Sequence, residues 1–193
     1  RINAAYEEFG NARDFYEGRF IGVSPTISAA LGERTRMSAF YTYDDDSRVT
    51  DRGLPSLEGG PLRGYDRTFF GDPVLNRSDS VAHIARLRLD HAFSDSLSVN
   101  VTGQFADHDK FYGNVVPASA TATTATLNGY TSGTDRQNRI VQGNLVWTAA
   151  FGAVESTLLA GVEASRQDTV AERYNIAFAN GATSVTVPLA RVL

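Results

Sequence analysis

The chain has 193 residues, of which 42% are hydrophobic and 21% are charged, and its net charge is −4. These values exclude an intrinsically disordered chain and a strongly basic surface, so we expect no nucleic-acid partner. The sequence has no cysteine, which excludes disulfides, thiolate catalysis and Cys-ligated metals. It also has no run of about 18 apolar residues, so we expect no membrane-spanning helix.

Seven segments alternate between apolar and polar residues with a period of two, which is typical of strands whose two faces meet different surroundings. In chain order they cover residues 1–7, 21–31, 35–44, 85–93, 97–106, 141–151 and 157–164. The first is the weakest. In the fifth, one face is formed by Leu97, Val99, Val101, Gly103 and Phe105. We therefore predict an all-β protein.

The apolar face of every segment is free of Asp, Glu, Lys and Arg, whereas the opposite face carries several of them. A lipid-facing surface requires this, because an Arg or Lys at the bilayer midplane costs about 2 to 4 kcal/mol. A soluble β-sandwich gives the same alternation, because one face of each of its sheets is dry. Alternation alone therefore leaves both folds open.

The connections between the segments alternate between short and long. Tight turns are predicted at 32–34, 94–96 and 152–154, whereas long loops are predicted after Glu7, Asp44 and Tyr112. The Thr/Ala/Gly-rich residues 118–134 are expected to form a flexible outer loop. An up-and-down meander with tight turns at one end and long loops at the other is how outer-membrane barrels are built. On this interpretation the third strand ends at Asp44, where the membrane ends.

Aromatic residues group at both ends of the predicted strands. Those beside the tight turns are Phe93, Trp147 and Phe151, and those toward the long loops are Tyr6, Tyr41, Tyr43, Phe111 and Tyr112. Two such groups are expected where a barrel crosses the two membrane interfaces.

Seven strands are odd in number and too few to close such a barrel. The sequence also begins at Arg1 without a Met, so we expect a part of a longer protein. The inward faces carry more charge than a small filled barrel packs, which predicts a wide lumen that is wet or plugged. The predicted lumen-facing or plug-facing residues are Arg36, Arg86, Arg88, Asp90, Glu155 and Glu163.

Six short strings carry a resemblance to a known family. They are RDFYEG (13–18), RVTDRGLPS (48–56), FFGDP (69–73), LNRSD (75–79), DKFYGNV (109–115) and LLAGVE (158–163). In this order and spacing they resemble the barrel of TonB-dependent siderophore receptors, and within them the branch assigned to ferric catecholate uptake. The resemblance implies that residues 1–193 belong to one antiparallel up-and-down transmembrane β-barrel domain. About seven or eight strands of a 22-stranded plugged barrel would be present, with the plug domain and the remaining strands absent.

The resemblance also implies the function and the partners. The protein would lie in the bacterial outer membrane, in contact with its lipid, and import a ferric siderophore as the transported ligand. Energy would come from the TonB-ExbB-ExbD complex through the plug. Arg86 and Arg88 would pair with acidic residues of the plug. The protein would not be an enzyme and would need no cofactor.

The long loop after Asp44 holds the candidate ligand-binding residues, which are Arg63, Tyr65, Arg67, Phe69 and Phe70. Ferric tris-catecholates are anionic and have aromatic edges, so they suit arginine for charge and aromatic rings for stacking. A structural alternative is that the FFGDP and DRGLPS strings fold this loop onto itself over the barrel rim.

Other candidate chemistry is weak. Residues 44–46 and 107–109 carry carboxylates, but neither has the spacing of a calcium loop, and solvated strand ends describe them better. His83, His91 and His108 are far apart and predict no metal site. There is no Walker sequence, G-x-G-x-x-G, G-x-S-x-G or cysteine nucleophile. Two other classes stay open: a passive porin or small structural barrel, and a secreted β-sandwich such as a lectin or adhesin module.

Overall fold

The structure is a computed structural model that describes residues 1–191. Its long strands are β1 (Ile2–Gly10), β2 (Glu17–Ala30), β3 (Thr35–Val49), β6 (Arg77–Ala92), β7 (Leu97–Ala120), β8 (Thr124–Phe151) and β9 (Val154–Asn175). The short elements are β4 (Ser56–Leu57), β5 (Gly60–Pro61), β10 (Ser184–Pro188) and the 3₁₀ turn η1 (Leu189–Arg191). Within the described range, none of the helical structure has the length and apolar character needed to cross a membrane.

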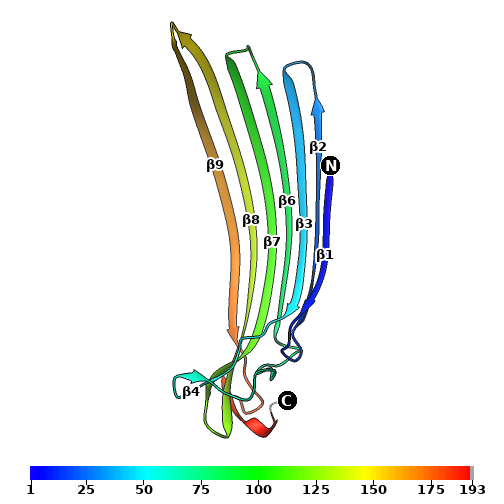
Figure 1. The fold of residues 1–193 in the computed structure, drawn as a ribbon, viewed down its shortest axis with the longest axis vertical. Helices are drawn as coiled ribbons and strands as arrows, with labels where there is room; N and C mark the ends of the chain where they lie inside the picture. The colour runs from blue at the N-terminus through cyan, green and yellow to red at the C-terminus, as the bar shows by residue number, and fades with distance from the viewer. Residues whose placement is uncertain (192–193) are drawn as a thin grey trace.

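The long strands form one antiparallel sheet in the order of the chain (Figure 1). Each long strand pairs with the next one, from β1 to β9, and β10 pairs with the first residues of β8, 124–128. β4 and β5 form a separate small hairpin. The predicted antiparallel up-and-down sheet of seven or eight strands is thus confirmed, and within residues 1–191 it does not close on itself.

The two ends of the sheet are built differently. At one end, β2–β3, β6–β7 and β8–β9 are joined by the tight turns 31–34, 93–96 and 152–153, as predicted. We call this the tight-turn end. At the other, the loop end, residues 50–76 form the longest connection, and β4, β5 and η1 lie there (Figure 1).

The prediction of a flexible outer loop at residues 118–134 is wrong. β7 and β8 continue through most of this segment and are joined at 121–123, where Thr121 and Thr124 hydrogen-bond through their hydroxyls at 2.8 Å. Threonine is β-branched and favours the strand conformation. Ala125 and Leu127 of this extension are buried, so the segment gains hydrophobic burial as well as strand pairing.

The prediction that the third strand ends at Asp44 is also wrong, because β3 continues to Val49 and pairs with β6 from Arg77 onward. Polar side chains support this extension. The Ser47 hydroxyl donates to Asp79 at 2.7 Å, and Arg19 lies 3.6 Å from Asp45. The sheet therefore projects past the level at which its apolar face ends.

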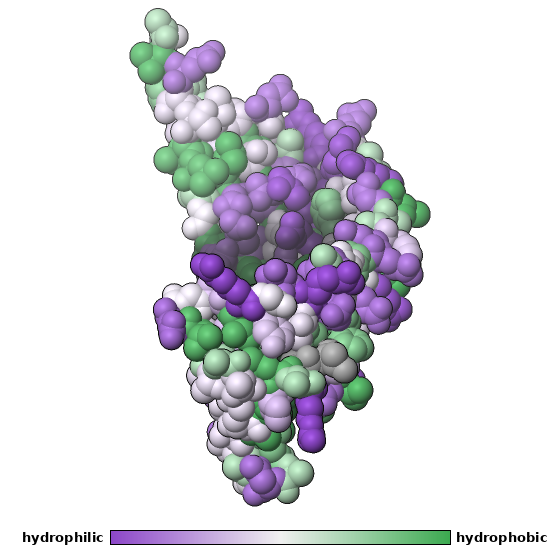
Figure 2. All heavy atoms as spheres, turned by 60° about the horizontal axis from the view of Figure 1, so that its bottom comes forward, coloured by the Kyte–Doolittle hydropathy of each residue, from purple (hydrophilic) through white to green (hydrophobic). Residues whose placement is uncertain are grey.

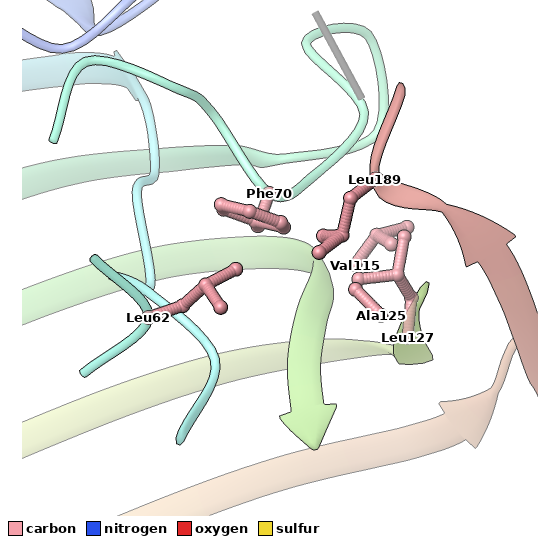
Figure 3. Packing of buried hydrophobic residues seen from close by; sticks show 6 residues of the cluster. All are labelled: Leu62, Phe70, Val115, Ala125, Leu127 and Leu189. Atoms are coloured by element: carbon pink, nitrogen blue, oxygen red, sulfur yellow. The ribbon is translucent and has the colours of Figure 1, made fainter. Parts of the chain in front are cut away.

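The buried hydrophobic core lies at the loop end and not under the middle of the sheet (Figure 3). It consists of Leu62, Phe70, Val115, Ala125, Leu127 and Leu189. These residues come from the long connection, from the extensions of β7 and β8, and from η1. The core thus joins segments that are far apart in the sequence into one packed unit at the loop end of the sheet.

Candidate functional site

The sheet has two chemically different faces. Strand register aligns Ser38, Arg88, Thr102, Gln142 and Glu163 in one row across five strands. We call the face of this row the inner face. Viewed with the loop end forward, the molecule shows hydrophilic side chains around a central hollow (Figure 2).

The opposite face, which we call the outer face, is apolar over most of its height. One of its rows consists of Met37, Leu89, Val101, Gly143 and Val162. The larger side chains are well exposed, with Val101 at 43% and Val162 at 73%. Exposed apolar rows on one face and charged rows on the other are the pattern of a lipid-facing barrel wall.

The structure places all of the predicted lumen-facing residues on the inner face, namely Arg36, Arg86, Arg88, Asp90, Glu155 and Glu163. Arg36 lies opposite Asp90, and Arg88 contacts Asp90 with Nη2 at 2.6 Å from Oδ1. Arg86, Arg88 and Glu163 line a hollow of about 400 Å³. These charges are thus grouped and open to a partner on that side.

The predicted ligand-binding residues of the long connection separate into two groups. Phe69 and Phe70 are each only 2% exposed. Phe70 belongs to the buried core, and Phe69 packs against Phe15 with ring centroids 5.9 Å apart. Neither ring offers a surface to a ligand in this conformation, so the structural alternative describes both of them.

Arg63, Tyr65 and Arg67 belong to the same connection but are less buried than the two phenylalanines. Arg63 and Arg67 are exposed, and Tyr65 is half-buried with its ring 5.8 Å from that of Phe70. Arg67 makes an exposed ion pair with Asp14 at 3.6 Å. Two guanidinium groups and a phenol are therefore accessible from solvent within one short stretch.

Arg13 connects the β1–β2 connection to the long connection. Its Nε lies 2.8 Å from Asp51, and its Nη1 donates to the backbone carbonyls of Tyr65 and Thr68 at 3.4 and 3.2 Å. The Asp14 N–H donates to the Arg67 carbonyl at 2.8 Å. The RDFYEG string is thus a brace that fixes the backbone carrying the candidate ligand residues.

Two buried asparagines fix the other side of the long connection. Asn76 is 1% exposed, and its amide donates to the carbonyls of Thr50 and Val115 at 2.9 Å each while accepting from the Val115 N–H at 2.7 Å. Asn114 is fully buried and accepts from Thr50 Oγ1 and Arg52 Nε. These bonds attach residues 50–76 to β7 at both of their ends.

A row of alternating large and small residues crosses the inner face at the loop end. From β1 to β9 it consists of Phe9, Gly18, Arg48, Ser78, Tyr112, Ser132 and Arg173. Lys110 and Tyr130 flank it on the neighbouring rows. We define the loop-end strip as Phe9, Arg48, Lys110, Tyr112, Tyr130 and Arg173.

Cations and aromatic rings lie against one another along the loop-end strip. The Arg173 guanidinium is 3.9 Å from the Tyr130 ring centroid, and the Tyr130 and Tyr112 rings meet edge to face at 6.0 Å. Lys110 Nζ is 5.5 Å from the Tyr112 centroid. Such contacts hold the rings and the charges in fixed positions.

Arg48 is held at the other end of the loop-end strip. Its guanidinium lies 4.8 Å from the Phe9 ring centroid and pairs with Asp46. Gly18 makes this possible, because a Cβ at that position would lie only 2.6 Å from the Phe9 ring. The Phe9 ring and the Arg48 side chain thus fill the space that the missing Gly18 side chain leaves.

No alternating segment of the sequence predicts the loop-end strip as a whole, although one signal for it is present. Tyr112 was predicted to join an interfacial group of aromatics, but the register places it on the inner face, unlike Phe111. Continuing the alternation of residues 97–105 to residue 112 gives that orientation. The pairing of Arg173 with Tyr130 arises from β8–β9 register, which no local pattern contains.

The carboxylate runs do not form metal sites. Asp44 and Asp46 lie on the inner face and Asp45 on the outer face, so the three cannot converge on one ion. Within residues 1–191 no group of three or more His, Asp or Glu side chains is placed to hold a metal. His91 lies beside the tight turn with Nδ1 2.8 Å from Thr35 Oγ1.

The chain is similar in sequence to a curated siderophore receptor. No protein-family model matches the chain. The probable TonB-dependent siderophore receptor PiuA of Acinetobacter baumannii (strain ATCC 19606) is 23% identical over 181 residues, which are 88% of this chain and 24% of PiuA. The chain thus spans about a quarter of the length of this relative.

Three solved structures are similar to nearly the whole chain. Fiu of E. coli K12, a ferric-catecholate import receptor, has a TM-score of 0.75 and 22% identity, covering 88% of this chain and 30% of Fiu. BauA, the ferric preacinetobactin receptor of Acinetobacter baumannii, has a TM-score of 0.80 and 16% identity, covering 98% and 28%. P. aeruginosa FpvA, solved with pyoverdine and iron, has a TM-score of 0.78 and 15% identity, covering 96% and 25%. These matches confirm the resemblance to TonB-dependent siderophore receptors and identify the sheet as a portion of the barrel found in such receptors.

Proposed function

We propose that this chain is part of an outer-membrane receptor that imports a ferric siderophore by TonB-dependent active uptake. The names of PiuA, Fiu and BauA support the general class, which is a transport receptor and not an enzyme. The exposed apolar outer face supports a position in the outer membrane, because water does not favour so large an apolar surface.

The proposed ligand is an anionic ferric chelate of catecholate type. The observation that carries this proposal is the loop-end strip, in which Arg48 and Arg173 are each held over an aromatic ring on the inner face. A ferric tris-catecholate presents negative charge and the edges of flat aromatic rings. Guanidinium groups and phenols supply the opposite charge, hydrogen bonds and stacking surfaces for such a ligand.

The long connection would make the first contact with the ligand. Arg63, Tyr65 and Arg67 are accessible there, and the Arg13 brace holds their backbone. Phe69 and Phe70 would contribute by holding the connection in place at the loop end and not by contacting the chelate. Two tiers of cationic and aromatic groups would thus lead from solvent toward the lumen.

The inner face near the tight-turn end would receive the plug. Arg36, Arg86, Arg88 and Glu163 are exposed on this face, and Asp90 is partly exposed. Acidic plug side chains would pair with these arginines, and the plug would transmit the action of the TonB-ExbB-ExbD complex. In this arrangement the ferric siderophore is a transported ligand and not a cofactor.

Substitution of the strip arginines tests the proposed ligand. In the purified full-length receptor, Arg48→Ala and Arg173→Ala should each weaken binding of a synthetic ferric tris-catecholate by about tenfold, because each removes a charge-assisted contact. Binding is measured by titration calorimetry. A neutral ferric trihydroxamate, titrated in parallel, should respond much less to either change.

Arg34→Ala is the matched control, because Arg34 is an exposed arginine at the tight-turn end, near Phe93 and Asp95. It should leave the affinity for the ferric tris-catecholate unchanged.

Cells that lack TonB should still bind the chelate but not accumulate its iron. Unchanged tris-catecholate affinity in the Arg48→Ala/Arg173→Ala double variant would rule out the strip as the ligand site.

A further inference from the structure

On β8 and β9, the outer face changes from apolar to charged at a single row of residues. From the tight turns up to Val141 and Ala164, the outer residues of the long strands include no Asp, Glu, Lys or Arg within the described sheet. The next row toward the loop end consists of Tyr41, Ala85, Phe105, Arg139 and Arg166. Two arginines therefore stand directly at the edge of the apolar surface.

The height of the apolar surface matches the hydrocarbon layer it would cross. Ten residue steps separate Val141 from Phe151 on β8. At about 3.4 Å per residue and a tilt of about 40°, they rise about 25 Å along the barrel axis, which is the height of the lipid-facing band in outer-membrane barrels. Arg139 and Arg166 would therefore lie at the level where lipid headgroups begin.

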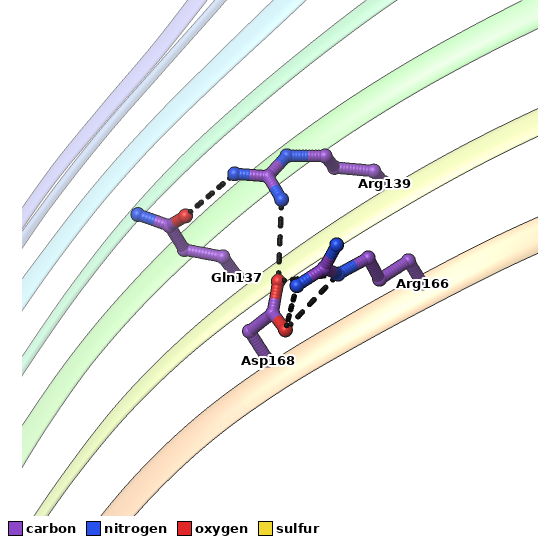
Figure 4. A network of polar contacts seen from close by, with 4 residues as sticks. All are labelled: Gln137, Arg139, Arg166 and Asp168. Carbon is purple, nitrogen blue, oxygen red and sulfur yellow. Dashed lines mark hydrogen bonds and ion pairs between the residues drawn. The ribbon is translucent and has the colours of Figure 1, made fainter.

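The two arginines are directly opposite each other on neighbouring strands. Like charges in this position are destabilising in a sheet. Asp168 lies between them, with Oδ2 3.2 Å from Arg139 Nη1 and both of its oxygens near Arg166, while Arg139 Nη2 also donates to Gln137 (Figure 4). One carboxylate thus pairs with two guanidinium groups, so these three side chains together carry one net positive charge.

Both guanidinium groups are accessible and are held in place. The side chain of Arg139 is 52% exposed and that of Arg166 is 72% exposed. Arg139 also lies 5.8 Å from the Phe105 ring centroid, which holds its charged end beside the edge of the apolar surface. An anion that lies at this height could accept hydrogen bonds from both residues.

We propose that Arg139 and Arg166 form a binding site for the phosphate-bearing headgroup of an outer-leaflet lipid. The inference rests on the proposed membrane position, but it does not depend on which chelate the receptor imports. Phosphate fits the paired donors of guanidinium groups and supplies the negative charge that Asp168 alone does not. The acyl chains of the same lipid would cover the apolar outer residues between this site and the tight-turn end, including Val141 and Ala164.

Lipid binding to the full-length receptor tests this site directly. Native mass spectrometry of the delipidated, detergent-purified protein measures retention of added lipid A and of dephosphorylated lipid A, which has the same acyl chains. The wild type should retain lipid A in preference to the dephosphorylated form. Arg139→Ala and Arg166→Ala should each lower lipid A affinity by about fivefold. The double variant should lose the preference.

Two control variants distinguish lipid binding from a purely structural ion-pair network. Arg136→Ala removes a charge from the inner face of the same strand and should leave lipid A retention unchanged. Asp168→Asn removes the carboxylate that competes with phosphate, so it should raise lipid A affinity. A structural network predicts the opposite result, which is lower stability with no gain in lipid binding.

Three results would overturn the assignment. The first is equal lipid A retention by the wild type and the Arg139→Ala/Arg166→Ala double variant. The second is equal retention of lipid A and its dephosphorylated form by the wild type. The third is complete displacement of lipid A by inorganic phosphate, which would make this a site for soluble anions. Ferric-chelate binding, measured on the same samples, reports separately on the proposed transport function.

Discussion

The middle of the sheet and its loop end are stabilised in different ways. Outer side chains of the middle strands, such as Leu87, Val141 and Leu158, are more than half exposed, so strand pairing is the main intramolecular contact there. At the loop end, Phe70 and Ala125 are almost completely buried. The middle therefore leaves its apolar surface to be covered from outside the chain, by lipid under the proposed function, whereas the loop end buries its own hydrophobic core as a water-soluble domain does.

This difference assigns separate roles to the two regions. Backbone pairing fixes which side chains face inward and outward along the middle strands. At the loop end, the buried core, the Arg13 brace and the bonds of Asn76 fix a connection that would otherwise be free in solution. A rigid loop end keeps the accessible groups of residues 63–67 in place, which under the proposed function would reduce the entropy lost on ligand binding.

The largest expected effect is on the loop end. Phe70→Ala should destabilise the packed connection by about 4 kcal/mol, because it removes a 2% exposed ring from a small core. Hydrogen exchange of residues 50–76 in the full-length protein measures this local opening. Val74→Ala changes a 79% exposed residue of the same connection and should have almost no effect. Faster exchange in the middle strands as well would contradict the separation of the two regions.

Introducing a charge on the outer face tests the middle of the sheet. Leu145 lies on the outer face near the centre of the apolar surface, so Leu145→Arg should cost about 3 kcal/mol in a lipid bilayer. The measurement is the free energy of folding into bilayers, followed by electrophoretic mobility without heating. Asn144→Arg places the same charge one residue away on the inner face and should cost much less. Equal costs for the two variants would mean that the outer face does not meet lipid.

The sequence predicted the middle of the sheet much better than the loop end, and the reason is physical. Alternation in residues 97–105 follows directly from one wet and one apolar surface, so it contains the orientation of each side chain. The burial of Phe70 depends on Leu189 and Val115, which come from other parts of the chain. Local composition also gives a wrong prediction for residues 118–134, because their strand structure comes from pairing between β7 and β8.

The candidate site follows the same rule. The inward orientation of Arg86, Arg88 and Glu163 could be predicted because each lies within an alternating segment. Arg48 and Arg173, by contrast, are separated by three other positions in their row, and only the complete strand register places them on one strip. A site assembled across strands beyond the alternating segments is invisible to any short sequence window.

The smallest expected effect on stability concerns Arg67, and it separates ligand binding from loop structure. The ion pair of Arg67 with Asp14 has side chains that are 78% and 42% exposed, so its loss should change loop-end stability by less than about 0.5 kcal/mol. Hydrogen exchange of residues 50–76 in Arg67→Ala should therefore match the wild type. If Arg67 contacts the ferric chelate, the same variant should bind a ferric tris-catecholate several-fold more weakly. A large change in exchange would instead show that Arg67 holds the connection in place, and the weaker binding would then follow from disorder of the loop and not from a lost contact.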